Sequence, residues 1–141
     1  MRYFSTALVV ANLAGSPALS QNMSEGDGYD FDTLAACAVV YGQIGEIYEE
    51  REATDQAASF QSTSLAYSAS AYHVLKYDGY DAQGGFDYGE DRMTRIVESL
   101  NAASDANSDG DMGVIEEWLP YCDTLGSGVN QILDRRDQDG W

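Results

Sequence analysis

The chain has 141 residues, of which 24 are acidic and 7 basic, and its formal net charge is −17 at neutral pH. A chain of this length suits one domain that can bury a hydrophobic core. Its negative charge repels phosphate backbones and anionic lipid surfaces, so we expect no nucleic-acid partner and no binding to an anionic membrane surface. The same field attracts cations and basic proteins, although exposed carboxylates also serve solubility alone.

Residues 1–20 have the pattern of a secretory signal peptide. Arg2 is followed by an apolar stretch over 3–14 and by a small-residue end at Ala18 to Ser20. The apolar stretch is shorter than the roughly 20 apolar residues of a membrane span, and no later segment approaches that length. We therefore expect a secreted or periplasmic protein that begins near Gln21 and is not inserted in a membrane.

After the predicted cleavage point, composition divides the chain into an arm, a domain and a tail. Residues 21–32 are rich in glycine, aspartate and serine, which predicts a flexible arm. Residues 33–134 carry the helical patterns, and Asp32 or Thr33 is the expected N-cap of the first helix. Residues 135–141 are polar apart from the last one and are expected to fray.

Apolar residues at steps of three and four predict four helices in the domain. They are expected over 33–53, from 54 to about 75, over 90–103, and from the last positions of 105–116 to about 132. Thr54 or Asp55 is the expected cap of the second helix, and Pro120, Gly126 and Gly128 should kink or loosen the fourth. Alternating β-branched runs are absent, so the expected fold class is all-α, a small four-helix bundle.

Cys37 and Cys122 are the only cysteines of the chain. An even count in an exported protein favours an intramolecular disulfide. A thiol pair or a metal site is the weaker alternative, because neither cysteine has a CxxC partner and His73 is the only histidine. Both cysteines fall on apolar stripes, so we expect a disulfide between the first and fourth helices.

Residues 105–116 match the full D-x-[DN]-x-[DN]-G-x5-E pattern without a gap. The chain here resembles a single EF-hand loop, and the resemblance covers these residues only. It implies that calcium is bound by oxygens of the following residues, with Asp111 using its backbone carbonyl and Glu116 binding through both carboxylate oxygens: Asp105, Asn107, Asp109, Asp111 and Glu116. Gly110 stands where such a loop turns sharply.

The sequence also departs from the EF-hand pattern. Ser104 replaces the apolar residue that usually ends the entering helix, Pro120 interrupts the exiting helix, and a second complete loop is absent. The expected calcium site is therefore weak and structural, a clamp on the loop rather than a sensor. The alternative is a connection of turn-forming residues that caps the fourth helix.

Residues 77–88 are expected to form a glycine-rich loop with aromatic and acidic side chains. Tyr77, Tyr80, Phe86 and Tyr88 are the candidate partner-binding residues, because their rings could meet a cationic or carbohydrate partner. The alternative is that these rings fold back and cover one end of the bundle.

The sequence predicts no enzyme. His73 stands alone on a helix, and no nucleophile motif surrounds the serines. We expect a binding or accessory protein with one weak structural calcium site and an unknown protein or small-molecule partner, and the acidic charge is compatible with a basic one. The alternatives are an envelope chaperone or structural protein without metal, and an acidic inhibitor or adaptor that docks a basic partner.

Overall fold

A computed structural model describes residues 28–140 of the chain, and this part contains five α-helices and no strand. The helices are α3 (Phe31–Glu50), α4 (Thr54–Tyr77), α5 (Ala82–Ala106), α6 (Gly110–Thr124) and α7 (Gly126–Asp139). The all-α fold class is confirmed, and the expected count of four helices becomes five. The predicted signal peptide and most of the predicted arm lie outside the described residues.

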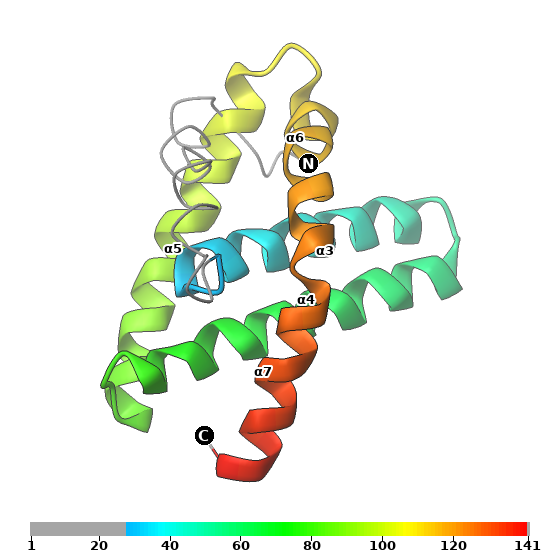
Figure 1. Cartoon of the computed structure of the whole chain (residues 1–141). Helices are drawn as coiled ribbons and strands as arrows, with labels where there is room; N and C mark the ends of the chain where they lie inside the picture. Colours follow the sequence, from blue (N-terminus) through cyan, green and yellow to red (C-terminus); the bar gives the residue numbers. More distant parts are fainter. Residues whose placement is uncertain (1–27, 141) are drawn as a thin grey trace.

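The helices α3 and α4 form an antiparallel hairpin, which α5 crosses at one end and which α6 and α7 cross nearer its middle (Figure 1). This arrangement replaces the expected set of four antiparallel helices. Because α4, α5 and α6 all pack against α3, that helix is buried along most of its length. No helix of the described residues is long and apolar enough to span a membrane.

The first described helix starts earlier than expected. Asp30 is its N-cap, and the Asp30 carboxylate accepts a 2.8 Å hydrogen bond from the Thr33 amide. The prediction of Asp32 or Thr33 as the cap was wrong, because Phe31 is buried and is already part of the helix. The predicted cap of α4 was also wrong, since that helix begins at Thr54 without a side-chain cap.

The helix α5 begins at Ala82, eight residues before the expected start, so much of the predicted 77–88 loop is helical. Asp81 caps it by accepting a 2.7 Å hydrogen bond from the Gly84 amide. Gly89 faces the ring of Tyr72, and a Cβ atom at Gly89 would lie 2.2 Å from Cε1 of that ring. Glycine here therefore permits close helix packing and does not mark a loop.

The expected fourth helix is two helices, α6 and α7, separated at Leu125 directly before Gly126. Glycine thus marks the break that the sequence indicated, while Pro120 is accommodated inside α6. The helix α7 continues to Asp139, so most of the predicted 135–141 tail is helical.

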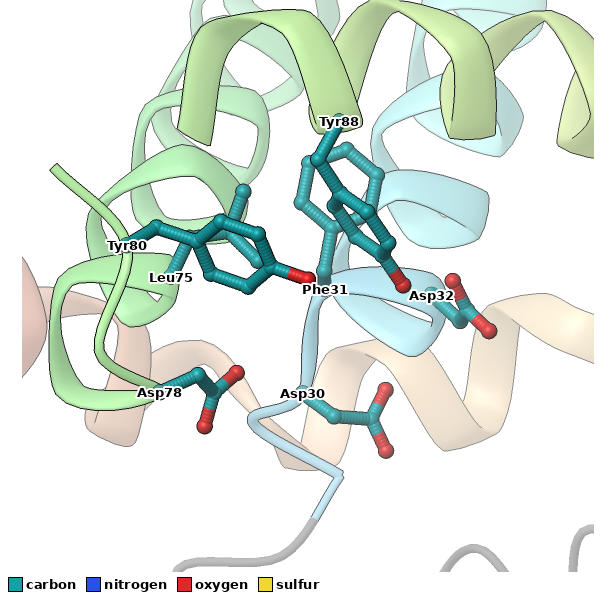
Figure 2. Close-up of a pocket in the computed structure, with 7 residues that line it drawn as sticks. All are labelled: Asp30, Phe31, Asp32, Leu75, Asp78, Tyr80 and Tyr88. Atoms are coloured by element: carbon teal, nitrogen blue, oxygen red, sulfur yellow. The ribbon is translucent and has the colours of Figure 1, made fainter. Parts of the chain in front are cut away.

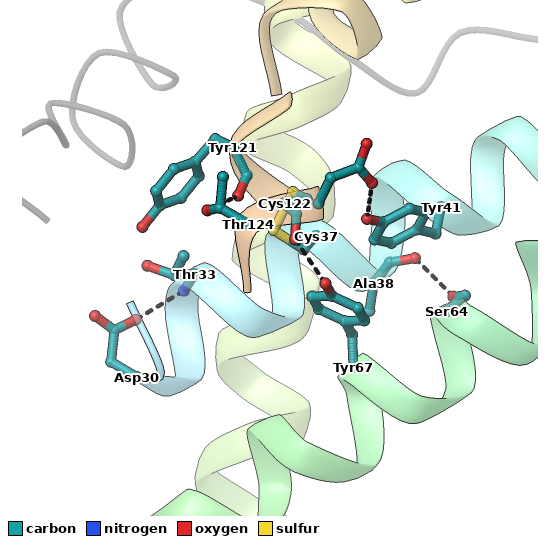
Figure 3. Close-up of a disulfide and its surroundings, with 11 residues drawn as sticks. Asp30, Thr33, Cys37, Ala38, Tyr41, Ser64, Tyr67, Tyr121, Cys122 and Thr124 are labelled. Carbon is teal, nitrogen blue, oxygen red and sulfur yellow. Dashed lines mark hydrogen bonds between the residues drawn. A yellow bond between two sulfur atoms is a disulfide. The ribbon is translucent and has the colours of Figure 1, made fainter. Parts of the chain in front are cut away.

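The predicted disulfide is confirmed and joins α3 to α6 (Figure 3). Cys37 and Cys122 are fully buried, and their Cα atoms are 5.6 Å apart. The Tyr67 hydroxyl donates a 2.6 Å hydrogen bond to the Cys122 carbonyl, and the Tyr41 hydroxyl donates one of 2.5 Å to the Asp123 carboxylate. Burial raises the pKa of both phenols, so they remain protonated donors beside the disulfide.

Candidate functional site

A pocket of about 410 Å³ lies where the start of α3 meets the end of α4 and the start of α5 (Figure 2). We call it the aspartate–tyrosine pocket, and it is lined by three carboxylates, two phenol rings and two apolar side chains: Asp30, Asp32, Asp78, Tyr80, Tyr88, Phe31 and Leu75. None of the described residues that line it is basic. The pocket is therefore both acidic and aromatic.

Packing of the rings fixes the aromatic wall of the pocket. The ring centroids of Tyr80 and Tyr88 are 5.1 Å apart, and Phe31 meets Tyr88 edge-on at 5.9 Å. The Tyr80 amide donates a 3.1 Å hydrogen bond to the Leu75 carbonyl, which holds the link between α4 and α5 against the end of α4. Contacts of this geometry are favourable between aromatic rings, so the tyrosine faces are held in place before any ligand arrives.

The carboxylates of the pocket have different surroundings. Asp32 accepts two hydrogen bonds from Arg92, of 2.7 Å and 2.5 Å, and this contact raises the pKa of Arg92. Asp78 is exposed at the C-terminal end of α4, where the partial negative charge of the helix disfavours a carboxylate. Burial, with Asp32 as the next cause, raises the pKa of Tyr88, so its ring remains neutral.

This arrangement suits an organic cation. Carboxylates form charge-assisted hydrogen bonds with ammonium or guanidinium groups, and the faces of tyrosine rings attract the same cations. Residues 28–140 hold no group of three acidic, histidine or cysteine side chains placed to bind a metal ion.

The four aromatic residues predicted to bind a partner do not share one site. Tyr80 and Tyr88 line the aspartate–tyrosine pocket, whereas Tyr77 and Phe86 are each 53 % exposed outside its lining. The Tyr77 hydroxyl lies 3.3 Å from Nε2 of the buried His73. Two of the four rings are thus brought together, and the other two face solvent separately.

Sequence reasoning did not find the three aspartates of the pocket. Asp30 and Asp32 fall in the predicted arm, and Asp78 belongs to the predicted loop but was not singled out. One signal was available, because an aspartate directly before the apolar Phe31 is a typical helix N-cap. The meeting of α3 with α4 and α5 depends on tertiary packing and leaves no local signal.

The predicted calcium residues are divided between two helices and a short turn. Asp105 belongs to the last turn of α5, and α6 already starts at Gly110, the sixth position of the pattern. Glu116, the expected bidentate ligand, is an exposed residue of α6. Of the apolar residues in this segment, Met112 is 45 % exposed and Ile115 is buried.

Other groups of the protein already engage several of these oxygens. The Asn107 side-chain carbonyl accepts a 2.9 Å hydrogen bond from the Asp109 amide, and the Asp111 carboxylate accepts one from the Ser104 hydroxyl. Gly110 has a φ of 60°, a left-handed conformation that favours glycine. Since the described residues contain no gathered metal-binding group, calcium binding at 105–116 stays a prediction.

Comparison with protein-family models, with curated proteins and with solved structures finds no match to this chain. The function of the protein is therefore inferred from the chemistry of its own pockets.

Proposed function

We propose that this protein is an exported acidic binding module that docks a basic protein partner and receives one of the partner's basic side chains in the aspartate–tyrosine pocket. The observation that carries the proposal is a pocket lined by three aspartates and two tyrosines, in a chain of net charge −17. Such a field speeds the encounter with a basic protein, and the pocket supplies the specific contact.

Asp78 supports a binding role because the fold gains little from its charge. A carboxylate at the C-terminal end of a helix costs a few tenths of a kcal/mol relative to a neutral side chain. The residue is nevertheless an aspartate that lines the pocket. A negative charge that lowers stability at a pocket wall is consistent with selection for a cationic ligand.

Export is part of the proposal and has separate support. The pattern over residues 1–20 is typical of a secretory signal. The disulfide between Cys37 and Cys122 suits an oxidising compartment. An acidic inhibitor or adaptor is the class of binding protein that best fits these properties.

The test compares two variants that remove the same charge at different places. A labelled, blocked peptide of lysine and glycine is titrated against the native protein, Asp78→Asn and Asp134→Asn, the last an exposed position of α7 outside the pocket lining. We expect Asp78→Asn to weaken binding by roughly three- to tenfold and Asp134→Asn by less than about twofold. Equal weakening by both variants would mean that the peptide senses only the overall charge.

A structural calcium clamp at 105–116 is the second candidate function. The complete ligand pattern and the left-handed backbone of Gly110 favour it. We expect millimolar calcium, and not magnesium, to raise the melting temperature, and we expect Glu116→Gln to remove the rise. Equal responses to the two cations would indicate screening of acidic charge and would dispose of the clamp.

A further inference from the structure

A second hollow, of about 420 Å³, runs along the outer seam of α3 and α4 and ends against α5. We call it the three-helix groove, and small, apolar and amide side chains with one carboxylate line it: Ala38, Val39, Gly42, Gln43, Glu46, Gln61, Ser64, Leu65, Ser68, Met93 and Val97. It shares no lining residue with the aspartate–tyrosine pocket. The groove is thus a separate site on the same α3–α4 hairpin.

Small residues at the seam open this groove. A Cβ atom at Gly42 would lie 3.2 Å from the Ser64 Oγ atom, so the two helices approach closely there. The Ser64 hydroxyl donates a 2.6 Å hydrogen bond to the Ala38 carbonyl of α3, so this short side chain lies against α3 (Figure 3). Leu65 stands at the rim and is 71 % exposed, which leaves an apolar surface uncovered.

Two polar side chains of α3, Gln43 and Glu46, line the groove. Gln43 is only 6 % exposed. One turn further, Oε2 of Glu46 is buried without a hydrogen-bond partner among residues 28–140. An unsatisfied buried oxygen of this kind lowers stability, so it calls for an explanation.

The electrostatic surroundings indicate which ligand group would satisfy this oxygen. Burial raises the pKa of Glu46, and the neighbouring carboxylates of Glu50 and Glu49 raise it further. A cation placed beside Glu46 would relieve both effects. A primary ammonium carries three donors, and it could therefore bond to the Glu46 carboxylate and the Gln43 carbonyl together.

We propose that the three-helix groove binds a lysine side chain flanked by apolar side chains, presented by a helical segment of the basic partner. The ammonium bonds to Glu46 and Gln43, and the apolar neighbours cover Leu65 and Met93. The wall from Ala38 to Glu46 is about 12 Å long at 1.5 Å per residue, which matches two turns of a helix. This inference rests on the proposed function, because the lysine belongs to the partner.

The experiment uses the full oxidised protein and two blocked helical peptides of alanine and serine. Both peptides carry leucines on two adjacent turns, and one has a lysine on the next turn where the other has norleucine. Ser68→Phe fills the groove, and Ser62→Phe is the matched control, since Ser62 is exposed on α4 outside the lining. Binding is followed by fluorescence anisotropy, and Glu46→Gln tests the ammonium contact.

We expect the native protein to bind the lysine peptide about tenfold more tightly than the norleucine peptide. Glu46→Gln should remove most of that difference, Ser68→Phe should weaken binding of both peptides about tenfold, and Ser62→Phe should change neither. The groove proposal falls if Glu46→Gln still binds the lysine peptide about tenfold more tightly than the norleucine peptide. It also falls if Ser68→Phe binds both peptides as tightly as the native protein does. If either result is found while Asp78→Asn still weakens binding of the lysine–glycine peptide, the proposed function stands without the groove.

Gln43→Leu provides a measurement that does not depend on a bulky substitution. Gln43 is only 6 % exposed, and replacing its polar side chain by an apolar one should raise the melting temperature by roughly 2 to 6 °C. The same change should lower the affinity for the lysine peptide severalfold. A lower melting temperature would show that the Gln43 amide stabilises the fold, and the proposed contact between the ammonium and Gln43 would then be abandoned.

Discussion

The contribution of the disulfide to stability can be calculated from its position in the chain. Cys37 and Cys122 are separated by 85 residues, and the closed loop contains all of α4 and α5. On the chain-entropy model, closing a loop of that length in the unfolded chain is worth about 4.5 kcal/mol. Domains of this size have unfolding free energies of about 5 to 15 kcal/mol in total, so the bond should decide much of the stability.

Urea unfolding with and without a phosphine reductant measures this contribution. Helix content is followed by circular dichroism at equilibrium, and the free energy of unfolding is extrapolated to water. We expect the reductant to lower that free energy by about 3 to 5 kcal/mol. The double variant Cys37→Ser with Cys122→Ser is the control, because its unfolding should not respond to the reductant.

A change below about 1 kcal/mol on reduction would show that the disulfide contributes far less than the loop length predicts. It would mean that the reduced unfolded chain is already compact, so that the cross-link removes little conformational freedom.

Three further predictions concern single side chains. Gly89→Ala places a Cβ atom against the Tyr72 ring and should cost about 1 to 3 kcal/mol, and an unchanged melting temperature would show that the ring moves aside freely. Tyr67→Phe removes one of two hydrogen bonds to the Cys122 carbonyl, which keeps the 3.0 Å bond from the Leu125 amide, and should cost about 1 kcal/mol in urea unfolding; a cost near zero would show that the Tyr67 hydrogen bond adds nothing. The pKa of Glu46 is raised above its ordinary value of 4.5, so its protonated form stabilises the fold at low pH, and this contribution is lost as pH rises through the raised pKa. Glu46→Gln should therefore gain stability relative to the native protein between pH 4.5 and neutrality, and a relative loss over that range would contradict the assignment.

The helical fold class and the disulfide could be predicted, because the first depends on local sequence patterns and the second on only two cysteines. Steps of three and four between apolar residues indicate helices whatever their packing, and two cysteines allow only one pairing. The position of Cys37 and Cys122 on apolar stripes then predicted which helices meet. The structure confirms the helical fold class. It also confirms the disulfide, in which the Cα atoms of Cys37 and Cys122 are 5.6 Å apart.

Helix ends and crossings were harder to predict. Gly84 and Gly85 resemble loop residues, yet Asp81 caps α5 and begins the helix before them. Gly89 likewise resembles a loop residue, but tertiary contact with Tyr72 explains it. Such contacts override local propensity and cannot be seen in a single sequence.

The candidate site was predicted only in part for the same reason. Tyr80 and Tyr88 were recognised as partner-binding candidates. Asp30 and Asp32 belong to the start of α3, which precedes these tyrosines by more than 40 residues in the chain. The pocket exists because the start of α3 packs between the end of α4 and the start of α5. A sequence pattern identifies side chains that can bind a cation but does not show which of them meet.

A titration of isotope-labelled protein with the lysine–glycine peptide, followed by amide chemical shifts, would show where a basic side chain binds. We predict that the largest shifts fall on the residues around the aspartate–tyrosine pocket, at 30–32, 78–80 and 88, and that they saturate with one dissociation constant. Shifts spread evenly over the acidic surface, or centred on 105–116, would contradict this prediction.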